Sequence, residues 1–166
     1  MLKEKIKTLS ELSEIRNRLR QQNKKVVFTN GVFDILHRGH VEYLDKARTY
    51  GDVLILGLNT DSSARNIKGE GRPLVKQEDR AIVIAGLWCV DFICFFEEKT
   101  PLKIIQQLQP DVLIKGGDYG LNDIVGKDFV ENTGGKVFTI PLTPGFSTTK
   151  LIEKVKKFIK ERELST

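Results

Sequence analysis

The stretch that most constrains this chain is residues 26–40, VVFTNGVFDILHRGH. An apolar run at 26–28 breaks at Asn30-Gly31, and a segment that ends in His37 and His40 follows. This pattern predicts a strand, a tight turn and the start of a helix. If the helix begins near His37, the two histidines lie three positions apart on one face of its first turn.

A turn of this kind suits an anion. Free backbone N–H groups, the positive end of the helix dipole and two imidazoles would converge on one point, which favours a polyphosphate. A lone histidine is usually structural, and the spacing of His37 and His40 does not by itself decide between a structural role and phosphate binding. The wider sequence around them has to decide it.

The rest of the chain alternates strand and helix patterns over short connections. Strands are predicted at 24–29, 52–58, 91–95, 111–114 and 136–140. Helices are predicted at 8–21, where Thr8 and Glu11 are placed as a capping box, and at 38–50, 78–87, from 100 onward, 127–132 and 150–163. Residues 59–77 are polar and glycine-containing and are expected to be mobile. This alternation predicts an α/β fold with a five-stranded, mainly parallel sheet and right-handed crossovers.

Length and composition indicate one domain. A chain of 166 residues can bury a sizeable core, and we expect a single domain over 1–166, with a helix inside 1–22 packed on it and a C-terminal helix at 148–163. No apolar stretch long enough to span a membrane and no signal-peptide pattern occurs, so we expect a cytoplasmic protein without a membrane partner.

The charge distribution and the cysteine spacing argue against a nucleic-acid-binding protein and against a metal site built by the protein. The net charge of +5 is modest and dispersed, and no stripe interleaves basic with aromatic residues, so nucleic acid is not an expected partner. Cys89 and Cys94 match no metal-ligand spacing. We expect buried, reduced thiols and no protein-built metal site.

Three polar clusters follow predicted strands, at 30–40, 115–118 and 143–149. Ligands of parallel sheets bind at the carboxyl ends of the strands, near the point where the strand order reverses. We therefore expect all three clusters to line one cleft.

The pattern T-N-G-V-F-D-I-L-H-R-G-H resembles the HxGH nucleotidyltransferases of the cytidylyltransferase-like superfamily. The resemblance implies a Rossmann-like three-layer sandwich and transfer of a nucleoside monophosphate from a nucleoside triphosphate to a phosphate-bearing acceptor, without a covalent intermediate. It implies that His37 and His40 contact the triphosphate and stabilise the transition state, and Lys68 matches a mobile lysine near the triphosphate. Mg²⁺ accompanying the nucleotide is the expected cofactor.

Two further motifs match this superfamily. Ser147-Thr148-Thr149 stands where the family has I-S-T-T, with Phe146 in place of the isoleucine; alone it reads as a helix cap, and in the family its hydroxyls hold phosphates. In the family, the acidic residue of the loop at 115–118 reaches the ribose, which makes Asp118 the ribose candidate. The predicted nucleotide-binding residues are Thr29, Asn30, Gly31, Phe33, Gly39, Lys115, Gly117, Asp118, Ser147, Thr148 and Thr149.

Longer phrases narrow the resemblance. L-N-T-D-S-S-A-R-N-I-K-G-E-G-R-P, D-F-I-C-F-F-E-E-K-T-P and P-D-V-L-I-K-G-G-D-Y are similar to the D-glycero-β-D-manno-heptose 1-phosphate adenylyltransferases. In many bacteria this domain follows a sugar kinase, and the chain resembles the stand-alone form. The resemblance implies ATP and a sugar 1-phosphate as partners, ADP-heptose and pyrophosphate as products for a bacterial surface glycan such as lipopolysaccharide core, and a homodimer.

Two alternatives stay open: a sister enzyme that uses CTP with glycerol 3-phosphate or another acceptor, and a nucleotide sensor without chemistry. The glycerol-phosphate branch carries R-T-x-G-I-S-T-T, whereas this chain has Leu142 in place of the arginine. The departure argues against that branch and leaves Lys68 or Lys150 as the replacement cation. The intact histidines weigh against the sensor.

The acceptor site is predicted from side chains that suit sugar hydroxyls and a phosphate. Asp34 lies inside the HxGH pattern, and Asn59 and Asp61 follow the second strand, although Asp61 also suits a helix cap. Arg72 or Arg80 would hold the sugar phosphate as a bidentate clamp. The sequence does not choose between these two arginines.

Overall fold

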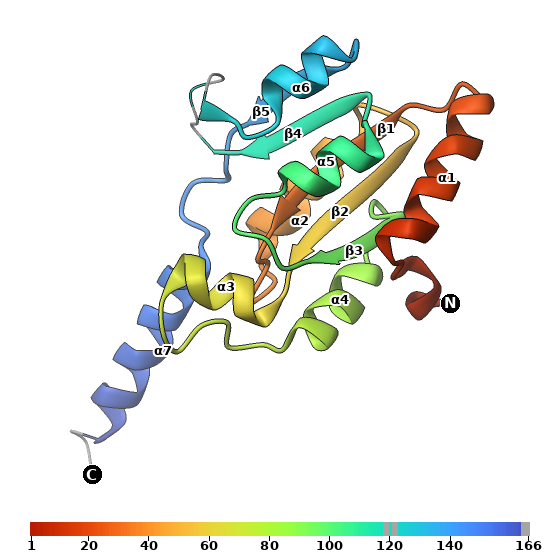
Figure 1. Cartoon of the computed structure of the whole chain (residues 1–166). Helices are drawn as coiled ribbons and strands as arrows, with labels where there is room; N and C mark the ends of the chain where they lie inside the picture. The colour runs from red at the N-terminus through yellow and green to blue at the C-terminus, as the bar shows by residue number, and fades with distance from the viewer. Residues whose placement is uncertain (118–119, 121–122, 164–166) are drawn as a thin grey trace.

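The computed structural model describes residues 1–117, 120 and 123–163 (Figure 1). All five strands of its sheet are parallel, in the order β3-β2-β1-β4-β5. The strands are β1 (Val26–Gly31), β2 (Val53–Asn59), β3 (Phe92–Phe96), β4 (Val112–Gly116) and β5 (Lys136–Ile140). The predicted α/β, Rossmann-like architecture is confirmed.

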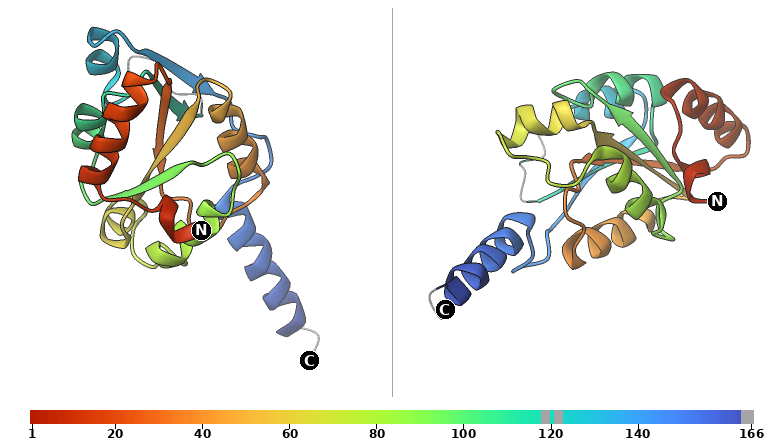
Figure 2. Two further views of the ribbon diagram at one scale, coloured as in Figure 1. Left: turned by 90° about the vertical axis from the view of Figure 1, so that its right-hand side faces the viewer. Right: turned by 90° about the horizontal axis from the view of Figure 1, so that it is seen from below.

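Helices cover both faces of this sheet. They are η1 (Leu2–Lys5), α1 (Leu9–Gln21), α2 (Arg38–Arg48), α3 (Asp61–Lys68), α4 (Gln77–Ala85), α5 (Leu102–Leu108), α6 (Lys127–Asn132) and α7 (Thr148–Glu163). One core lies between the sheet and α2 with α4, and a second lies between the sheet and α1, α5 and α6 (Figures 1 and 2). These layers form the three-layer sandwich.

The central strands begin with continuous apolar runs because both of their faces are covered. In β1, Val27 packs into the α2 core, while Val26 and Phe28 pack into the α1 and α5 core. In β2, Leu54 and Ile55 divide between the two cores in the same way. Successive side chains of a strand point to opposite faces, so a continuous apolar run is what a doubly covered strand requires.

The strand order reverses between β1 and β4. From β1 the chain continues to β2 and β3 on one side, and β4 and β5 lie on the other side. The crossovers leave the carboxyl ends of these two strands open, which is where ligands of such sheets bind. The turn at 31–37 follows β1 and Gly117 follows β4, so two of the three predicted clusters meet at this reversal.

The segment after β2 differs from the sequence prediction. Residues 59–77 were expected to be an irregular polar region, but α3 occupies Asp61–Lys68. Thr60 caps this helix, because its hydroxyl oxygen accepts a hydrogen bond from the N–H of Ser63 at 3.3 Å. The buried residues of α3 are the small Ser63 and Ala64, which give no apolar stripe that periodicity would detect.

The predicted capping box of α1 is confirmed. The N–H of Thr8 donates to Glu11 Oε2 at 2.7 Å, and the N–H of Glu11 donates to the Thr8 hydroxyl at 3.3 Å. Leu12 on the inner face of α1 is fully buried in the core that also contains α5. The first helix is therefore packed on the sheet, as predicted.

Arg16 joins α1 to the sheet. Its side chain is 4% exposed and donates to the carbonyl oxygens of Leu108 and Gln109, the last residue and the C-cap of α5. It also donates to Asp111 Oδ1 at 2.9 Å, while the N–H of Val26 donates to Asp111 Oδ2 at 2.7 Å. One buried guanidinium thus connects α1, α5 and the start of β1.

The last helix is an exception to this packing. α7 projects away from the sheet (Figures 1 and 2), and none of its residues is buried.

Among the helices that the structure describes, none is both long and apolar enough to cross a membrane. Cys89 and Cys94 are buried free thiols, as predicted.

Replacing Arg16 by Ala is expected to lower the free energy of unfolding by about 2–3 kcal/mol, since it leaves buried carbonyls and the Asp111 carboxylate without their donor. Urea denaturation would measure the change. Arg20→Ala is the matched control, because the Arg20 side chain is exposed and donates to the side chain of Gln109. A loss of the same size in both variants would contradict the role assigned to Arg16.

Candidate functional site

The turn after β1 brings the two histidines to the sheet edge. Phe33 takes a left-handed backbone conformation (φ 47°) and is 7% exposed. A Cβ on Gly31 would lie 2.7 Å from the Phe33 ring, so glycine at 31 lets the ring fold under the turn. The ring centroid of Phe33 lies 5.0 Å from that of His40, and His37 is the N-cap residue of α2. The predicted strand, turn and helix start are confirmed.

The imidazoles of His37 and His40 stack on each other, with centroids 3.8 Å apart and planes 17° from parallel. The Nδ1 atoms of both rings are buried, and neither has a hydrogen-bond partner. Burial lowers the pKa of His37, and burial together with the charge of His37 lowers the pKa of His40 to about 4. The pair is therefore neutral near pH 7, and an anion beside it would favour protonation.

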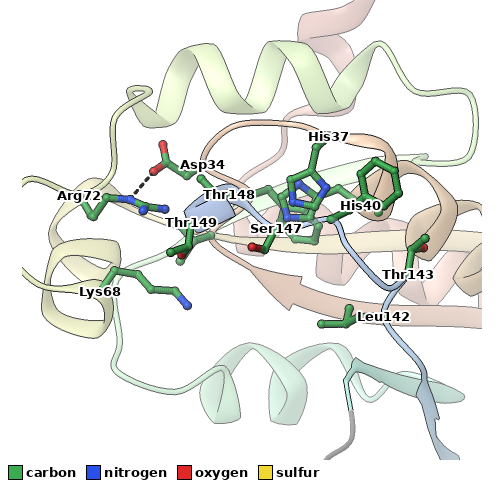
Figure 3. Close-up of a pocket in the computed structure, with 14 residues that line it drawn as sticks. Asp34, His37, His40, Lys68, Arg72, Leu142, Thr143, Ser147, Thr148 and Thr149 are labelled. Carbon is green, nitrogen blue, oxygen red and sulfur yellow. Dashed lines mark hydrogen bonds and ion pairs between the residues drawn. The ribbon is translucent and has the colours of Figure 1, made fainter. Parts of the chain in front are cut away.

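The start of α7 faces this pair. The N–H of Lys150 donates to the Ser147 hydroxyl at 3.1 Å, and Thr148 and Thr149 form the first turn, with their hydroxyls at the pocket (Figure 3). A hydroxyl-bearing helix N-terminus is a favourable environment for phosphate. The helix-cap role of Ser147 is confirmed.

Gly39 explains how the two walls approach each other. A Cβ on Gly39 would lie 3.2 Å from Phe146 Cβ and 3.2 Å from the His37 ring. Contacts this short force the neighbour to move, and here the neighbours are the loop that precedes α7 and a stacked imidazole. The glycine of the HxGH pattern therefore lets these two cavity walls approach each other.

Asp34 holds the third wall. It is 3% exposed, and its Oδ2 accepts from Arg72 Nε at 2.7 Å. Its Oδ1 accepts from the N–H groups of Leu74 and Val75 at 2.8 and 2.9 Å. Asp34 was predicted to bind the sugar, but in the structure both of its oxygens hold the 72–75 segment, and this places Arg72 at the pocket (Figure 3).

These walls enclose a cavity of about 360 Å³. It is lined by Val32, Phe33, Asp34, His37, Gly39, His40, Lys68, Arg72, Leu142, Thr143, Phe146, Ser147, Thr148 and Thr149 (Figure 3). Thr143 belongs to the cluster at 143–149 that was expected to line the cleft, whereas Leu142 was missed, because the sequence offered only a resemblance to a motif from which Leu142 departs. The Thr143 hydroxyl donates to Glu42 Oε2 at 2.6 Å, which joins this loop to α2.

Other predicted nucleotide contacts lie elsewhere. Thr29 is fully buried, and its hydroxyl is hydrogen-bonded to that of Tyr43 at 2.5 Å. Gly117 has φ 114°, a conformation that favours glycine, and its N–H donates to the carbonyl of Ile140 at 2.9 Å. Asp118, the ribose candidate, lies outside the described residues.

Arg80 is built into the protein interior. It is 1% exposed and donates to the carbonyls of Val75, Val32 and Asn59 and to Asp61 Oδ1 at 2.7 Å. These contacts join the turn after β1, the end of β2 and the start of α4. The structure gives no support for a substrate role of Arg80 or Asp61, and of the two arginines that the sequence left open it is Arg72 that lines the cavity.

A second cavity of about 210 Å³ opens at the same sheet edge. It is lined by Asn30, Asn59, Ile67, Phe96, Lys99, Thr100, Pro101, Leu113, Lys115, Asp123, Ile124 and Val125. Lys115 Nζ donates to Asn30 Oδ1 at 3.4 Å. Of the three predicted clusters, the first and third line the larger cavity, while Asn30 and Lys115 line this one. Sequence reasoning gave no site role to its β3–α5 residues, although they lie in the phrase D-F-I-C-F-F-E-E-K-T-P, and it missed its residues before α6.

Within the described part of the chain, no cluster of three or more His, Cys, Asp or Glu side chains is placed to hold a metal ion. Asp34 is the carboxylate among the residues that line the larger cavity, and both of its oxygens already accept hydrogen bonds. A divalent ion that enters this cavity would therefore need most of its ligands from the bound substrate.

A switch-point cavity walled by two imidazoles and a hydroxyl-bearing helix N-terminus defines a nucleotide-binding α/β enzyme. The sequence profile of the family described as cytidylyltransferase-like matches residues 28–158. The chain belongs to this family and is a nucleotidyltransferase.

Relatives agree with this assignment. The chain is 52% identical over 153 residues to the bifunctional protein HldE of Geobacter sulfurreducens, covering 92% of this chain and 31% of the relative. It is 54% identical over 151 residues to the HldE of Trichlorobacter lovleyi, covering 91% and 31%. The chain thus spans about a third of the length of these curated relatives.

Solved structures share the fold. A lipopolysaccharide core biosynthesis protein of Thermoplasma volcanium is 28% identical with a TM-score of 0.60, covering 72% of this chain and 97% of that protein. A pantoate-β-alanine ligase of Francisella tularensis is 22% identical with a TM-score of 0.57, covering 82% and 66%, and shows likeness of fold alone.

Asp34→Asn is expected to weaken binding of a non-hydrolysable nucleoside triphosphate analogue about three- to tenfold, because the amide loses the ion pair that places Arg72 at the cavity. Titration calorimetry would measure the affinity. Asp79→Asn, an exposed change on α4, is the matched control and is expected to have no effect. Unchanged affinity in Asp34→Asn would exclude the positioning role.

The pKa of His40 predicts how stability depends on pH. An unfolded histidine has a pKa of about 6.5, so between pH 6.5 and 4 the unfolded chain binds a proton at this position and the folded chain does not. The stability that His40 confers is therefore complete above pH 6.5 and falls as the pH drops toward 4. His40→Asn is expected to flatten this fall, measured as urea midpoints at pH 7.5, 6 and 4.5.

The carboxylates titrate alike in both proteins, so the difference between the two curves isolates His40. The chain has two histidines, so the NMR signal that disappears in His40→Asn belongs to His40 and the remaining one to His37. Pyrophosphate is expected to raise both pKa values. Parallel stability curves, or pKa values that pyrophosphate leaves unchanged, would contradict a phosphate-facing pair.

Proposed function

We propose that this nucleotidyltransferase moves AMP from ATP onto D-glycero-β-D-manno-heptose 1-phosphate, giving ADP-heptose and pyrophosphate for a bacterial surface glycan such as lipopolysaccharide core. The observation that carries the chemistry is the stacked pair His37 and His40, whose Nδ1 atoms have no hydrogen-bond partner, opposite the hydroxyl-bearing start of α7. The adenylyl donor and heptose acceptor rest on the sequence resemblance. The name of the Thermoplasma relative, a lipopolysaccharide core biosynthesis protein, is consistent with that product.

The transfer is a single displacement at the α-phosphorus of ATP. A phosphate oxygen of the acceptor attacks the α-phosphorus of ATP and forms the new P–O bond. The bond from this phosphorus to the oxygen that bridges to the β-phosphorus breaks, and pyrophosphate leaves with the electron pair. His37, His40 and the N-terminus of α7 hold the β- and γ-phosphates, where charge builds as pyrophosphate departs.

Lys68 is the cation that we assign in place of the arginine missing at Leu142. Lys68 lines the cavity together with Leu142, whereas Lys150 is exposed and is not among the lining residues. Gly69 and Gly71, both with positive φ, follow Lys68 and have open space where a Cβ would be. The backbone between Lys68 and the anchored Arg72 can therefore adjust and let Lys68 move toward the triphosphate on binding.

Mg²⁺ enters this proposal with the nucleotide, as MgATP. Its ligands are expected to be mainly triphosphate oxygens and water, because Asp34 is engaged by Arg72 and by two backbone N–H groups. When bound, the ion supplies positive charge to the triphosphate. The chain's own part is to hold the phosphates on the histidine side and to exclude water.

The test is pyrophosphate release with Mg²⁺, a panel of nucleoside triphosphates and the 1- or 3-phosphates of heptose, glucose and glycerol. ATP with the heptose 1-phosphate is expected to give the highest kcat/KM. His37→Ala is expected to lower kcat about 100- to 1,000-fold with a smaller change in the KM for ATP. Lys24→Ala, an exposed change far from the cavity, is the control.

Three other outcomes of this assay would contradict the proposal. Preference for CTP and glycerol 3-phosphate would replace the proposed reaction with that of the sister branch. ATP binding without turnover of any acceptor would indicate a sensor. An unchanged kcat in His37→Ala would remove the histidine pair from the mechanism.

A further inference from the structure

The segment 141–147 between β5 and α7 carries the last helix to the larger cavity. α7 projects away from the sheet and has no buried residue, so packing of the helix itself does not fix where it begins (Figures 1 and 2). Its first turn nevertheless lines the cavity, through Thr148 and Thr149. The position of this end of α7 therefore depends largely on the contacts that the preceding loop makes with the rest of the protein.

Glu42 on α2 receives this loop. Its Oε2 accepts a hydrogen bond from the Thr143 hydroxyl at 2.6 Å, and its Oε1 accepts one from Arg38 Nε at 2.6 Å. Arg38 and Glu42 lie four residues apart, so their side chains share one face of α2. One carboxylate thus connects the loop to the first turn of the helix whose N-cap is His37.

Arg38 contacts the same loop a second time. Its guanidinium lies over the Phe146 ring, 5.4 Å from the ring centroid, which is within the range of a cation–π contact. Phe146 stands where the family motif has isoleucine, which offers no aromatic face to an arginine. The residue between the two histidines and the residue before Ser147 are therefore paired across the two cavity walls.

We infer that Glu42 is a positioning residue of this nucleotidyltransferase, which holds the start of α7 at a fixed separation from the histidine pair. It acts as part of a latch that consists of Arg38, Glu42, Thr143 and Phe146. The inference rests on the proposed function, since it takes the nucleotide phosphates to lie between these two walls. A phosphate that contacts both walls needs them at one separation, and a latch formed before binding avoids the entropy loss of ordering the loop.

Neither motif includes Glu42, and it is not among the residues that line the cavity. The sign of its charge distinguishes positioning from a direct electrostatic effect. A carboxylate close to a phosphate site repels the anion, so Coulomb's law alone predicts that removing Glu42 tightens the binding of pyrophosphate. If Glu42 holds the loop, removing it weakens binding instead, because the start of α7 is no longer in place when the anion arrives.

Glu42→Ala is expected to weaken pyrophosphate binding about three- to tenfold, measured by titration calorimetry without any acceptor. The Glu42 side chain is 42% exposed, so the change leaves the core intact and the urea midpoint is expected to stay unchanged. Asp45→Ala is the matched control, because it removes the same charge from an exposed position on the same helix. Its affinity for pyrophosphate is expected to equal that of the wild type.

A double-mutant cycle tests whether Glu42 acts through the loop. Thr143→Val removes the hydroxyl that donates to Glu42, and Thr143→Ser retains a hydroxyl there. Thr143→Val is expected to weaken pyrophosphate binding, Thr143→Ser to bind like the wild type, and Glu42→Ala with Thr143→Val to bind no more weakly than Glu42→Ala alone. A Thr143 hydroxyl that bound phosphate directly would instead give additive losses.

The outcomes separate this inference from the function itself. If wild-type protein binds no pyrophosphate, the phosphate site of the proposed function fails and the inference fails with it. If wild-type protein binds pyrophosphate, but Glu42→Ala binds it equally well or more tightly, the inference alone is overturned. Additive losses in the cycle, or a loss that Asp45→Ala shares, would equally overturn it.

Discussion

The site depends on the reversal of strand order between β1 and β4. Because the chain continues from these neighbours in opposite directions, no crossover covers their carboxyl ends, and the turns that follow them face an open crevice. The turn after β1 supplies His37 and His40, and the loop before α7 closes on them from the other side. Gly39 permits that approach, since any larger residue would press on Phe146 and on the stacked ring of His37. The glycine of the HxGH pattern is therefore a packing requirement.

The charged residues around the crevice form two groups: some hold the backbone of the turns, and others line the cavities. Arg80 and Asp34 are almost completely buried, and both bind the backbone of neighbouring turns. Arg80 donates hydrogen bonds to backbone carbonyls, and Asp34 accepts them from backbone N–H groups. By fixing those turns they position Arg72 and Asn59 at the cavity walls. Lys68 lines the larger cavity and Lys115 lines the smaller one, and the neutral histidine pair faces the α7 start. Because burial lowers the pKa values of both histidines, the empty pair is neutral near pH 7. A phosphate beside the pair would favour protonation and so a positive charge where negative charge develops.

Much of the fold was predictable because its signals are local. Five apolar runs predicted the five strands, and the capping box of Thr8 and Glu11 marked the start of α1. α3 was not predictable, since its buried face consists of Ser63 and Ala64, whose small side chains leave no periodic apolar signal. In the site, the histidines and Ser147–Thr149 were found where motifs placed them. Asp34, Asp61 and Arg80 were predicted as substrate ligands, and the structure shows that each has partners within the chain, which a charge next to a motif cannot reveal.

The sequence by itself determined the strand–turn–helix unit, the alternation that makes a parallel sheet, and the residue types able to bind phosphate, because each depends on neighbours within a few positions. Only the tertiary structure decided which of those residues face the crevice. Arg72 reaches it through Asp34, Arg80 is enclosed by three carbonyls and a carboxylate, and the smaller cavity is assembled from the ends of four strands and the segments that follow them. Such contacts join residues far apart in the chain, and no local pattern encodes which of the possible partners will be near.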